Sequence, residues 1–327
     1  MKRLLILSIF LACGGSPEEK ARAVLEAGLE DESEKVQIAA AGALARIGES
    51  RGEEVLSEFL KSGDNELVAI TIDNLSRIPD TINSRYLRPM LKHRSPLVRR
   101  MAIEGLLKLG VRDDRIIDCL KESSVPIVVC ASRYCGMMKV RKAKPALRRL
   151  LRRKEPEVRI NAEIGLALLG ERGAIARLKK EMERKEPVIW EEAIKGLGLV
   201  KDTASIEFLE EVIEGGIWPL NILSIESLMR IGIHKDKILE RFLSSDDPMV
   251  RIRAISIINE LGDDRFLGSV LGLTEDPFLN VAIQAIEFCS RHPTPEVREK
   301  LASLLNAKNP YIRIAAAEGY LRSKTQR

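Results

Sequence analysis

The sequence is poor in aromatic residues, with 2 Trp, 4 Tyr and 7 Phe among 327 residues. Compact cores in a chain of this length normally depend on large aromatic side chains. The shortage therefore argues against the two globular domains that the length alone would suggest. Hydrophobic residues nevertheless make up 45% of the chain, which excludes a disordered protein. We expect a helical protein packed mainly by Leu, Ile and Ala.

Cysteine is also scarce, because five residues are too few for a disulfide-stabilised scaffold. Beyond Cys13, the remaining Cys119, Cys130, Cys135 and Cys289 lack the spacing of metal ligands. We expect these four to be small buried hydrophobic residues. If the protein is exported, one disulfide among the first three of them remains possible.

Motifs for catalysis are missing too. The three histidines, His93, His234 and His292, form no His-x-x-x-His or His-Glu pair. No Walker loop, Gly-x-Ser-x-Gly elbow or Cys-x-x-Cys pair is present. We therefore expect no metal, no cofactor and no catalytic residue, and the protein is interpreted as a non-enzyme.

The N-terminus contains one hydrophobic run, from 4 to 12, which is too short to span about 30 Å of hydrocarbon. Met1, Lys2 and Arg3 precede it and Cys13 follows it, which is the layout of a secretory signal. A Cys at this place resembles the lipobox of bacterial lipoproteins. The resemblance implies a signal peptide at 1–12, a lipidated Cys13 with a tether to 17, and a location in the cell envelope. The alternative is an uncleaved N-terminus on a cytoplasmic protein.

From residue 18 onward the chain repeats itself. The clearest copies of the repeat are Pro96 to Arg99, Pro156 to Arg159, Pro248 to Arg251 and Pro310 to Arg313. An aliphatic residue, here called the anchor, recurs every 29 to 33 residues. The ten anchors are Val36, Val68, Val98, Val128, Val158, Ile189, Leu220, Val250, Leu279 and Ile312. Such a period indicates stacked supersecondary units.

Each repeat reads as two helices. Ala is frequent four residues after the anchor, on the same helix face. Small residues seven after it, such as Gly165 and Gly196, should let neighbouring helices approach closely. Gly twelve after it, as at Gly110 and Gly170, should end the first helix. A second, Leu-rich helix then follows, so we expect a single solenoid over 18–327 in which only neighbouring repeats share a core.

The segment Asp247-Pro248-Met249-Val250-Arg251, followed by Ala and Leu-Gly, resembles the HEAT repeat, in its short subtype named after phycobilisome lyases. The resemblance implies an all-α fold, a right-handed α-solenoid of about ten two-helix repeats. It also implies that the anchor helices line the concave side. A further implication is a structural ladder in which the repeat arginines pair with acidic turn residues of adjacent repeats. Those arginines are Arg99, Arg159, Arg251 and Arg313.

On each anchor helix, the residues exposed on the concave side should lie three, six and ten positions after the anchor, and together they form a stripe. It is charged in most repeats but apolar in the fourth and fifth, where we expect an exposed protein-binding patch. The predicted patch comprises Ala131, Tyr134, Met138, Ile164, Leu168 and Leu199. The alternative is that local packing buries these side chains.

Positive charge is concentrated between 133 and 185, where 17 Lys and Arg stand against six Glu and no Asp. One helix in this segment carries a basic cluster that should face outward and could bind an anionic headgroup or an acidic protein. The cluster is Lys144, Arg148, Arg149, Arg152 and Arg153. Nucleic acid is not expected as a partner, because stacking aromatics are missing.

Together these patterns predict a lipid-anchored, non-catalytic scaffold that binds another protein through its concave surface. Two alternatives remain. One is a cytoplasmic lyase or modification-enzyme subunit similar to the bilin lyases, and the other is a polyanion-binding module that uses the basic segment 133–185.

Overall fold

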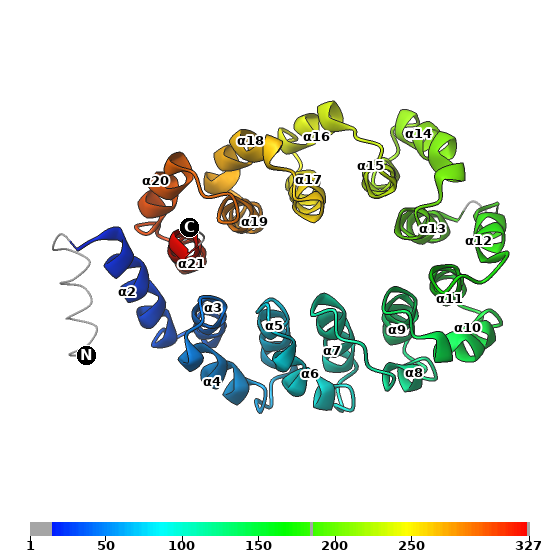
Figure 1. The fold of residues 1–327 in the computed structure, drawn as a ribbon, viewed down its shortest axis with the longest axis horizontal. Helices are drawn as coiled ribbons and strands as arrows, with labels where there is room; N and C mark the ends of the chain where they lie inside the picture. The colour runs from blue at the N-terminus through cyan, green and yellow to red at the C-terminus, as the bar shows by residue number, and fades with distance from the viewer. Residues whose placement is uncertain (1–14, 184–185, 326–327) are drawn as a thin grey trace. The chain divides into compact units, whose positions relative to one another are not determined.

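A computed structural model describes residues 15–183 and 186–325, and these residues form α-helices, short 3-10 helices and no strands (Figure 1). The helices pair into repeats, so the predicted all-α fold of two-helix repeats is confirmed. Every anchor lies in an odd-numbered helix. These are α3 (Glu34–Arg46), α5 (Asn65–Ser76), α7 (Pro96–Lys108), α9 (Val125–Met137), α11 (Pro156–Leu168), α13 (Pro187–Val200), α15 (Leu220–Ile231), α17 (Pro248–Leu261), α19 (Leu279–Cys289) and α21 (Pro310–Thr325).

The even-numbered helices form the second layer. They are α2 (Pro17–Leu29), α4 (Ser50–Phe59), α6 (Ser84–Met90), α8 (Ile116–Cys119), α10 (Lys144–Leu150), α12 (Ala174–Met182), α14 (Ile206–Glu214), α16 (Asp236–Leu243), α18 (Leu267–Gly272) and α20 (Pro295–Leu304). The 3-10 helices are η1 (Thr81–Asn83), η2 (Arg141–Ala143), η3 (Thr203–Ser205), η4 (Asp264–Phe266) and η5 (Leu273–Glu275). The predicted signal peptide and Cys13 lie outside the described residues.

The odd-numbered helices begin and end at residues suited to those positions. Pro96, Pro156 and Pro248 each open a helix, where the missing N–H is no loss. Left-handed residues follow the helix ends, as at Gly110 (φ 65°) and Gly170 (φ 75°). Proline at the start and a left-handed residue after the end therefore explain where these helices begin and end.

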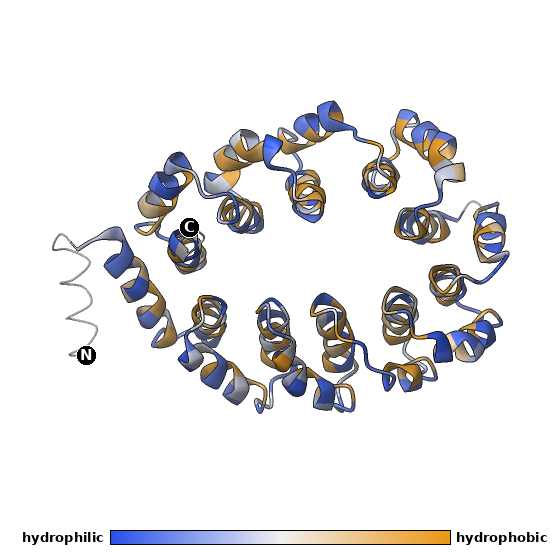
Figure 2. Ribbon diagram, in the orientation of Figure 1, coloured by the Kyte–Doolittle hydropathy of each residue, from blue (hydrophilic) through white to orange (hydrophobic). Residues whose placement is uncertain are grey.

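The core lies between the two layers. The helices combine hydrophobic and hydrophilic residues, as their mixed colours in Figure 2 show. The anchors Val98, Val158 and Ile189 are completely buried. Aliphatic residues dominate the core, and only a few aromatic side chains are buried, as the composition predicts.

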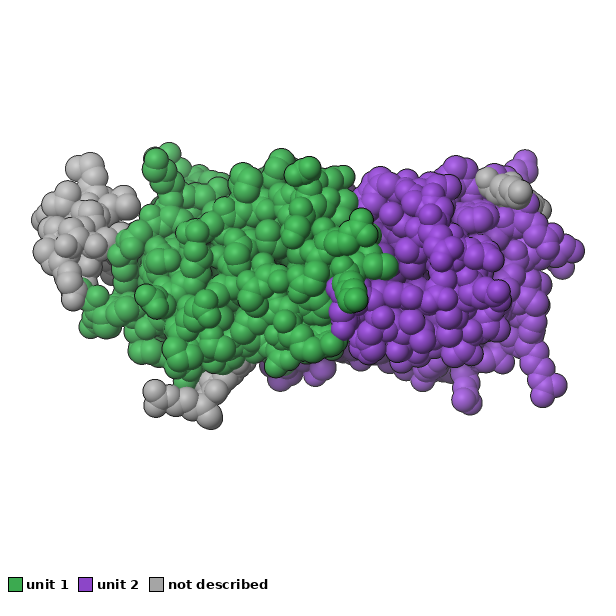
Figure 3. All heavy atoms as spheres, turned by 90° about the horizontal axis from the view of Figure 1, so that it is seen from above, with its two compact units in different colours: residues 1–79, 237–327 green, residues 80–236 purple. Residues whose placement is uncertain are grey.

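Packing divides the chain into two compact units (Figure 3). Unit 1 comprises 1–79 and 237–327, and unit 2 comprises 80–236. Both units are built from the same two-helix repeats.

In unit 1 the two ends of the chain pack together. Helices α2 and α3 both contact α21, the last helix (Figure 1). Arg46 on α3 donates two hydrogen bonds of 2.8 Å to the Glu318 carboxylate on α21. The expectation that only sequence neighbours share a core is therefore wrong for unit 1, because ion pairs and close packing join repeats at opposite ends of the sequence.

Among the described residues, no helix is both long and apolar enough to cross a membrane.

Candidate functional site: the inner layer of unit 2

The odd-numbered helices of unit 2 pack very closely, and small residues make this possible. A Cβ placed on Gly136 of α9 would lie 2.9 Å from the Gly165 Cα of α11. A Cβ on Gly196 of α13 would lie 2.5 Å from Ile164. Real side chains never approach so closely, so glycine is required at these contacts. The predicted role of Gly165 and Gly196 in close helix packing is confirmed.

Helix α9 lies one residue out of the predicted register. In α7 and α11 the proline is the first helical residue, but in α9 Val125 comes first and Pro126 second. The true anchor is therefore Ile127 rather than Val128. Lys139, in a left-handed conformation at φ 55°, supports this assignment because it lies twelve residues after Ile127.

The shift buries two residues of the predicted patch. Ala131 and Tyr134 are completely buried, so their expected exposure is wrong. The Tyr134 hydroxyl donates a hydrogen bond to the Val111 carbonyl and accepts one of 2.8 Å from the Asp113 backbone N–H. Burial raises the pKa of Tyr134 to about 12. This tyrosine fastens a loop to α9 and is not available to a partner.

The rest of the predicted patch is divided. Ile164 is also completely buried, although α11 has the expected register, because it belongs to a hydrophobic cluster with residues of α12 and α13. The expectation of an exposed Ile164 is therefore wrong as well. Met138, Leu168 and Leu199 are only half-buried.

With the register corrected, three apolar side chains occupy position ten after the anchors of adjacent helices. They are Met137 on α9, Leu168 on α11 and Leu199 on α13, here called the +10 row. Met137 is 41% exposed. The sequence pattern did not identify Met137 as an exposed residue of this row, because Pro126 suggested the wrong register for α9.

Beside the +10 row lies a network of polar groups, here called the Glu192 network. Glu192 on α13 forms an ion pair with Arg133 of α9 and another, at 3.1 Å, with Lys195. Asn161 of α11 donates a 2.8 Å hydrogen bond to Glu192 and accepts one of 2.6 Å from Arg133. The network therefore ties three consecutive inner helices together.

The environment of Glu192 favours its charged form. Burial alone would raise the pKa of this carboxyl, but the positive charges of Arg133 and Lys195 and the bond from Asn161 lower it below its usual range. Further along the layer, Arg100 pairs with Glu104 at 2.8 Å and Arg230 with Glu226 at 2.7 Å. The inner layer thus presents paired charges around one apolar row.

Only part of the predicted basic cluster is available to bind an anionic partner, because several of its side chains already pair with glutamates of this chain. Helix α10 ends at Leu150, so the last two cluster residues follow it. Arg148 makes two 2.8 Å hydrogen bonds to Glu171, and Lys144 lies 3.6 Å from the same carboxylate. Arg153 is bound to Glu155 at 3.0 Å. Arg149 and Arg152 are exposed, and neither has an ion-pair partner among the described residues.

Three ladder arginines bind a carboxylate, but only two of them bind an acidic turn residue as the resemblance implies. Arg99 binds Glu122 at 2.6 and 3.0 Å, and Arg251 binds Asp276 at 2.7 and 2.9 Å. These acidic residues precede the next inner helix. Arg159 instead binds Glu181, which lies within α12, at 3.1 Å. Arg313 makes the same backbone contacts as the others but, among the described residues, no carboxylate pair.

The four described cysteines are free thiols. Cys119, Cys135 and Cys289 are buried, as predicted for small hydrophobic residues. Cys130 is half-buried, and its Sγ donates to a Glu104 oxygen at 3.2 Å. Burial, reinforced by that carboxylate, raises the pKa of Cys130 to about 12, so the thiol stays protonated at neutral pH.

These features define an α-helical repeat protein. The family model of HEAT repeats matches residues 8–76 and 236–321. No curated protein matches the chain.

Several solved structures resemble it at low sequence identity. An engineered protein is 17% identical, with 93% of this chain and 99% of that one covered and a TM-score of 0.36. The CpcE–CpcF complex of phycocyanin lyase from Nostoc sp. PCC7120 is 17% identical, with 76% and 91% covered and a TM-score of 0.40. Human deoxyhypusine hydroxylase is 14% identical, with 84% and 99% covered and a TM-score of 0.34.

Proposed function

We propose that the protein is a non-catalytic HEAT-repeat scaffold that binds another protein through the inner layer of unit 2. The observation that carries the proposal is the +10 row, in which Met137, Leu168 and Leu199 form a partly exposed apolar strip beside the charged Glu192 network. An apolar centre with a polar rim is the usual composition of a protein interface. Met137 adds an adaptable side chain that can fit an irregular partner surface.

The chemistry of the inner layer supports binding rather than catalysis. Reactive groups in enzymes usually have a pKa shifted toward the working pH. For three groups of the inner layer the shifts go the other way, since burial raises the pKa of Cys130 and Cys135 to about 12 and the ion pairs keep that of Glu192 low. Groups that keep one protonation state near neutral pH suit a binding surface better than a catalytic site.

Substitution of Met137 tests the binding surface. The intact chain is used to capture partners from cells, and the wild type is compared with Met137→Glu and with Met249→Glu. Met249 is a matched control because it is 60% exposed on α17 in unit 1. We expect Met137→Glu to lose at least about tenfold of a specific captured protein, with an unchanged helical melting curve. Equal loss in both variants would contradict the proposal.

We further propose that a lipid on Cys13 holds the scaffold in the bacterial cell envelope. The charged start, short apolar run and following Cys support this. Metabolic labelling with a fatty acid should mark the wild type and leave Cys13→Ala unlabelled. An unlabelled wild type found in the cytoplasm would instead favour the alternative of a cytoplasmic modification-enzyme subunit.

Anion binding by the basic segment is a second candidate function, favoured by the exposed Arg149 and Arg152, which have no ion-pair partner in the part of the chain that the structure describes. Sedimentation with vesicles containing phosphatidylglycerol tests it. We expect wild-type binding that weakens with salt and falls several-fold in the double variant Arg149→Glu/Arg152→Glu. Identical binding of the two proteins would exclude this role.

A further inference from the structure

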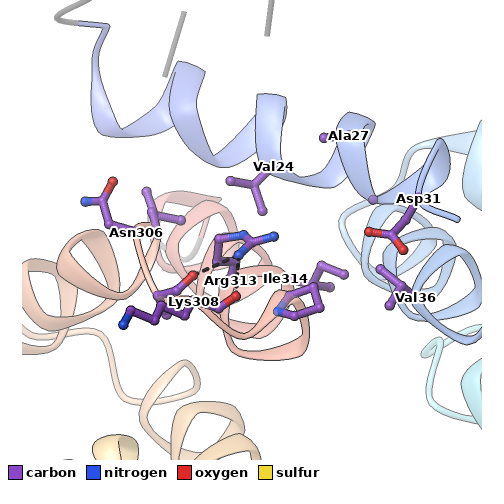
Figure 4. Close-up of a pocket in the computed structure, with 12 residues that line it drawn as sticks. Val24, Ala27, Asp31, Val36, Asn306, Lys308, Arg313 and Ile314 are labelled. Atoms are coloured by element: carbon purple, nitrogen blue, oxygen red, sulfur yellow. Dashed lines mark hydrogen bonds between the residues drawn. The ribbon is translucent and has the colours of Figure 1, made fainter. Parts of the chain in front are cut away.

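A pocket of about 350 Å³ lies in unit 1, where α2 and the start of α3 face the loop that leads into α21 (Figure 4). Its apolar lining includes Val24, Leu305 and Ile314, all of which are buried. Its charged lining includes Asp31 and Arg313. A cavity of this size and composition is of the kind that holds a small molecule.

Arg313 is the ladder arginine that has no carboxylate. Its Nη1 donates to the carbonyls of Ala307 and Lys308 at 2.9 and 2.8 Å. The guanidinium of Arg99 is held by two carbonyls in the same way. In Arg99 the Nε and Nη2 groups then bind Glu122, whereas those of Arg313 bind no group among the described residues. Arg313 is therefore fixed in position with two donors open.

Asp31 is the residue expected to meet those donors. It lies five residues before the anchor Val36, just as Glu122 lies five before Ile127. Its Oδ1 accepts a 2.9 Å bond from the Ser33 backbone N–H, and it has no ion-pair partner in the described part of the chain. Figure 4 shows Arg313 near the centre of the lining residues and Asp31 at the right, with Ile314 between them in this view.

A molecule that fills the gap must satisfy both charges. It needs a carboxylate for the two Arg313 donors, since a planar guanidinium binds a carboxylate through two parallel hydrogen bonds. It needs a cationic group for Asp31 and an aliphatic body that can lie against the pocket lining of Val24 and Ile314. We propose that this pocket binds a free α-amino acid with an aliphatic side chain, with its carboxylate on Arg313 and its ammonium group on Asp31. The proposal is independent of the protein-binding role of unit 2.

Calorimetry on the full chain tests the proposal with three probes of similar shape. L-leucine carries both charges, 4-methylpentanoate only the carboxylate and 3-methylbutylamine only the ammonium group. We expect leucine to bind at least tenfold more tightly than either of the others. No heat with leucine, or equal affinity for leucine and 4-methylpentanoate, would overturn the proposal.

Two variants assign the roles of the charged residues. Arg313→Gln should abolish leucine binding. Asp31→Asn should remove the advantage of leucine over 4-methylpentanoate while leaving 4-methylpentanoate binding intact, which also shows that the pocket is still folded. Undiminished leucine binding by either variant would overturn the assignment. A second result would also overturn the proposal: the wild type binds no ligand, and the two variants lose the same amount of stability. This result would mean that Arg313 and Asp31 pair with each other directly.

Discussion

At the scale of single residues, Tyr134 illustrates how one position in a helix decides between surface and core. A one-residue change of register rotates a helical side chain by about 100° around the axis. Tyr134 consequently points into the core, where its hydroxyl is the partner of the Asp113 N–H and the Val111 carbonyl. The polar group is buried but satisfied.

The first prediction follows from that pairing. Tyr134→Phe should destabilise the protein by about 1–3 kcal/mol, because the buried Asp113 N–H loses its acceptor. Urea denaturation followed by circular dichroism measures this loss. Tyr86→Phe serves as control, because Tyr86 is partly exposed on α6 and should change stability by less than about 0.5 kcal/mol. Equal effects of the two substitutions would mean that the Tyr134 hydroxyl is not buried.

At the scale of helices, sequence and structure agree where local chemistry decides the outcome. The period of the anchors places all ten inner helices, and left-handed glycines such as Gly110 and Gly170 mark their ends. The register of α9 could not be predicted from Pro126, because proline is tolerated at either the first or the second position of a helix. The burial of Ile164 depends on how α12 and α13 pack against α11, and this is a property of tertiary packing.

The second prediction concerns the Glu192 network, which joins α9, α11 and α13. Because the folded protein lowers the pKa of Glu192 below the ordinary 4.5, the network stabilises the fold above about pH 4.5 and loses this contribution as the pH falls through the lowered value. Glu192→Gln should therefore cost about 1.5–3 kcal/mol at pH 7 and progressively less below pH 4.5.

Urea titrations at a series of pH values measure this dependence. Glu191→Gln is the matched control, because Glu191 is the next residue on the same helix and lies outside the network. A gap between Glu192→Gln and the wild type that stays constant from pH 7 to pH 3 would contradict the assigned shift.

At the scale of the whole molecule, the joined chain ends in unit 1 distinguish this protein from an open repeat array. In such an array each repeat touches only its neighbours, and stability is a sum of local terms. Here α21 packs against α2 and α3, and Arg77 on α5 forms a 2.8 Å ion pair with Glu287 on α19. No sequence pattern reveals these contacts, because complementary charges separated by 210 residues carry no periodic signal.

The last prediction measures that long-range coupling. Arg46 and Glu318 are 272 positions apart in sequence, yet their side chains are only 12% and 11% exposed and share two hydrogen bonds. Burial opposes the charged form of Arg46, but Glu318 and further acidic groups outweigh it and raise the pKa of Arg46, so the guanidinium stays charged. Arg46→Leu and Glu318→Leu should each cost about 3 kcal/mol, because each removes one member of a largely buried pair, and Glu318 keeps only its longer 3.4 Å contact with Arg322. The double variant should cost at least about 1 kcal/mol less than the sum, since neither member of the Arg46–Glu318 pair is then left buried without the other. Equilibrium urea denaturation of the four proteins gives the coupling energy directly.

Strict additivity would mean that the two ends of the chain are not in contact in solution, and the first and last repeats would then have to be treated as the exposed ends of an open array.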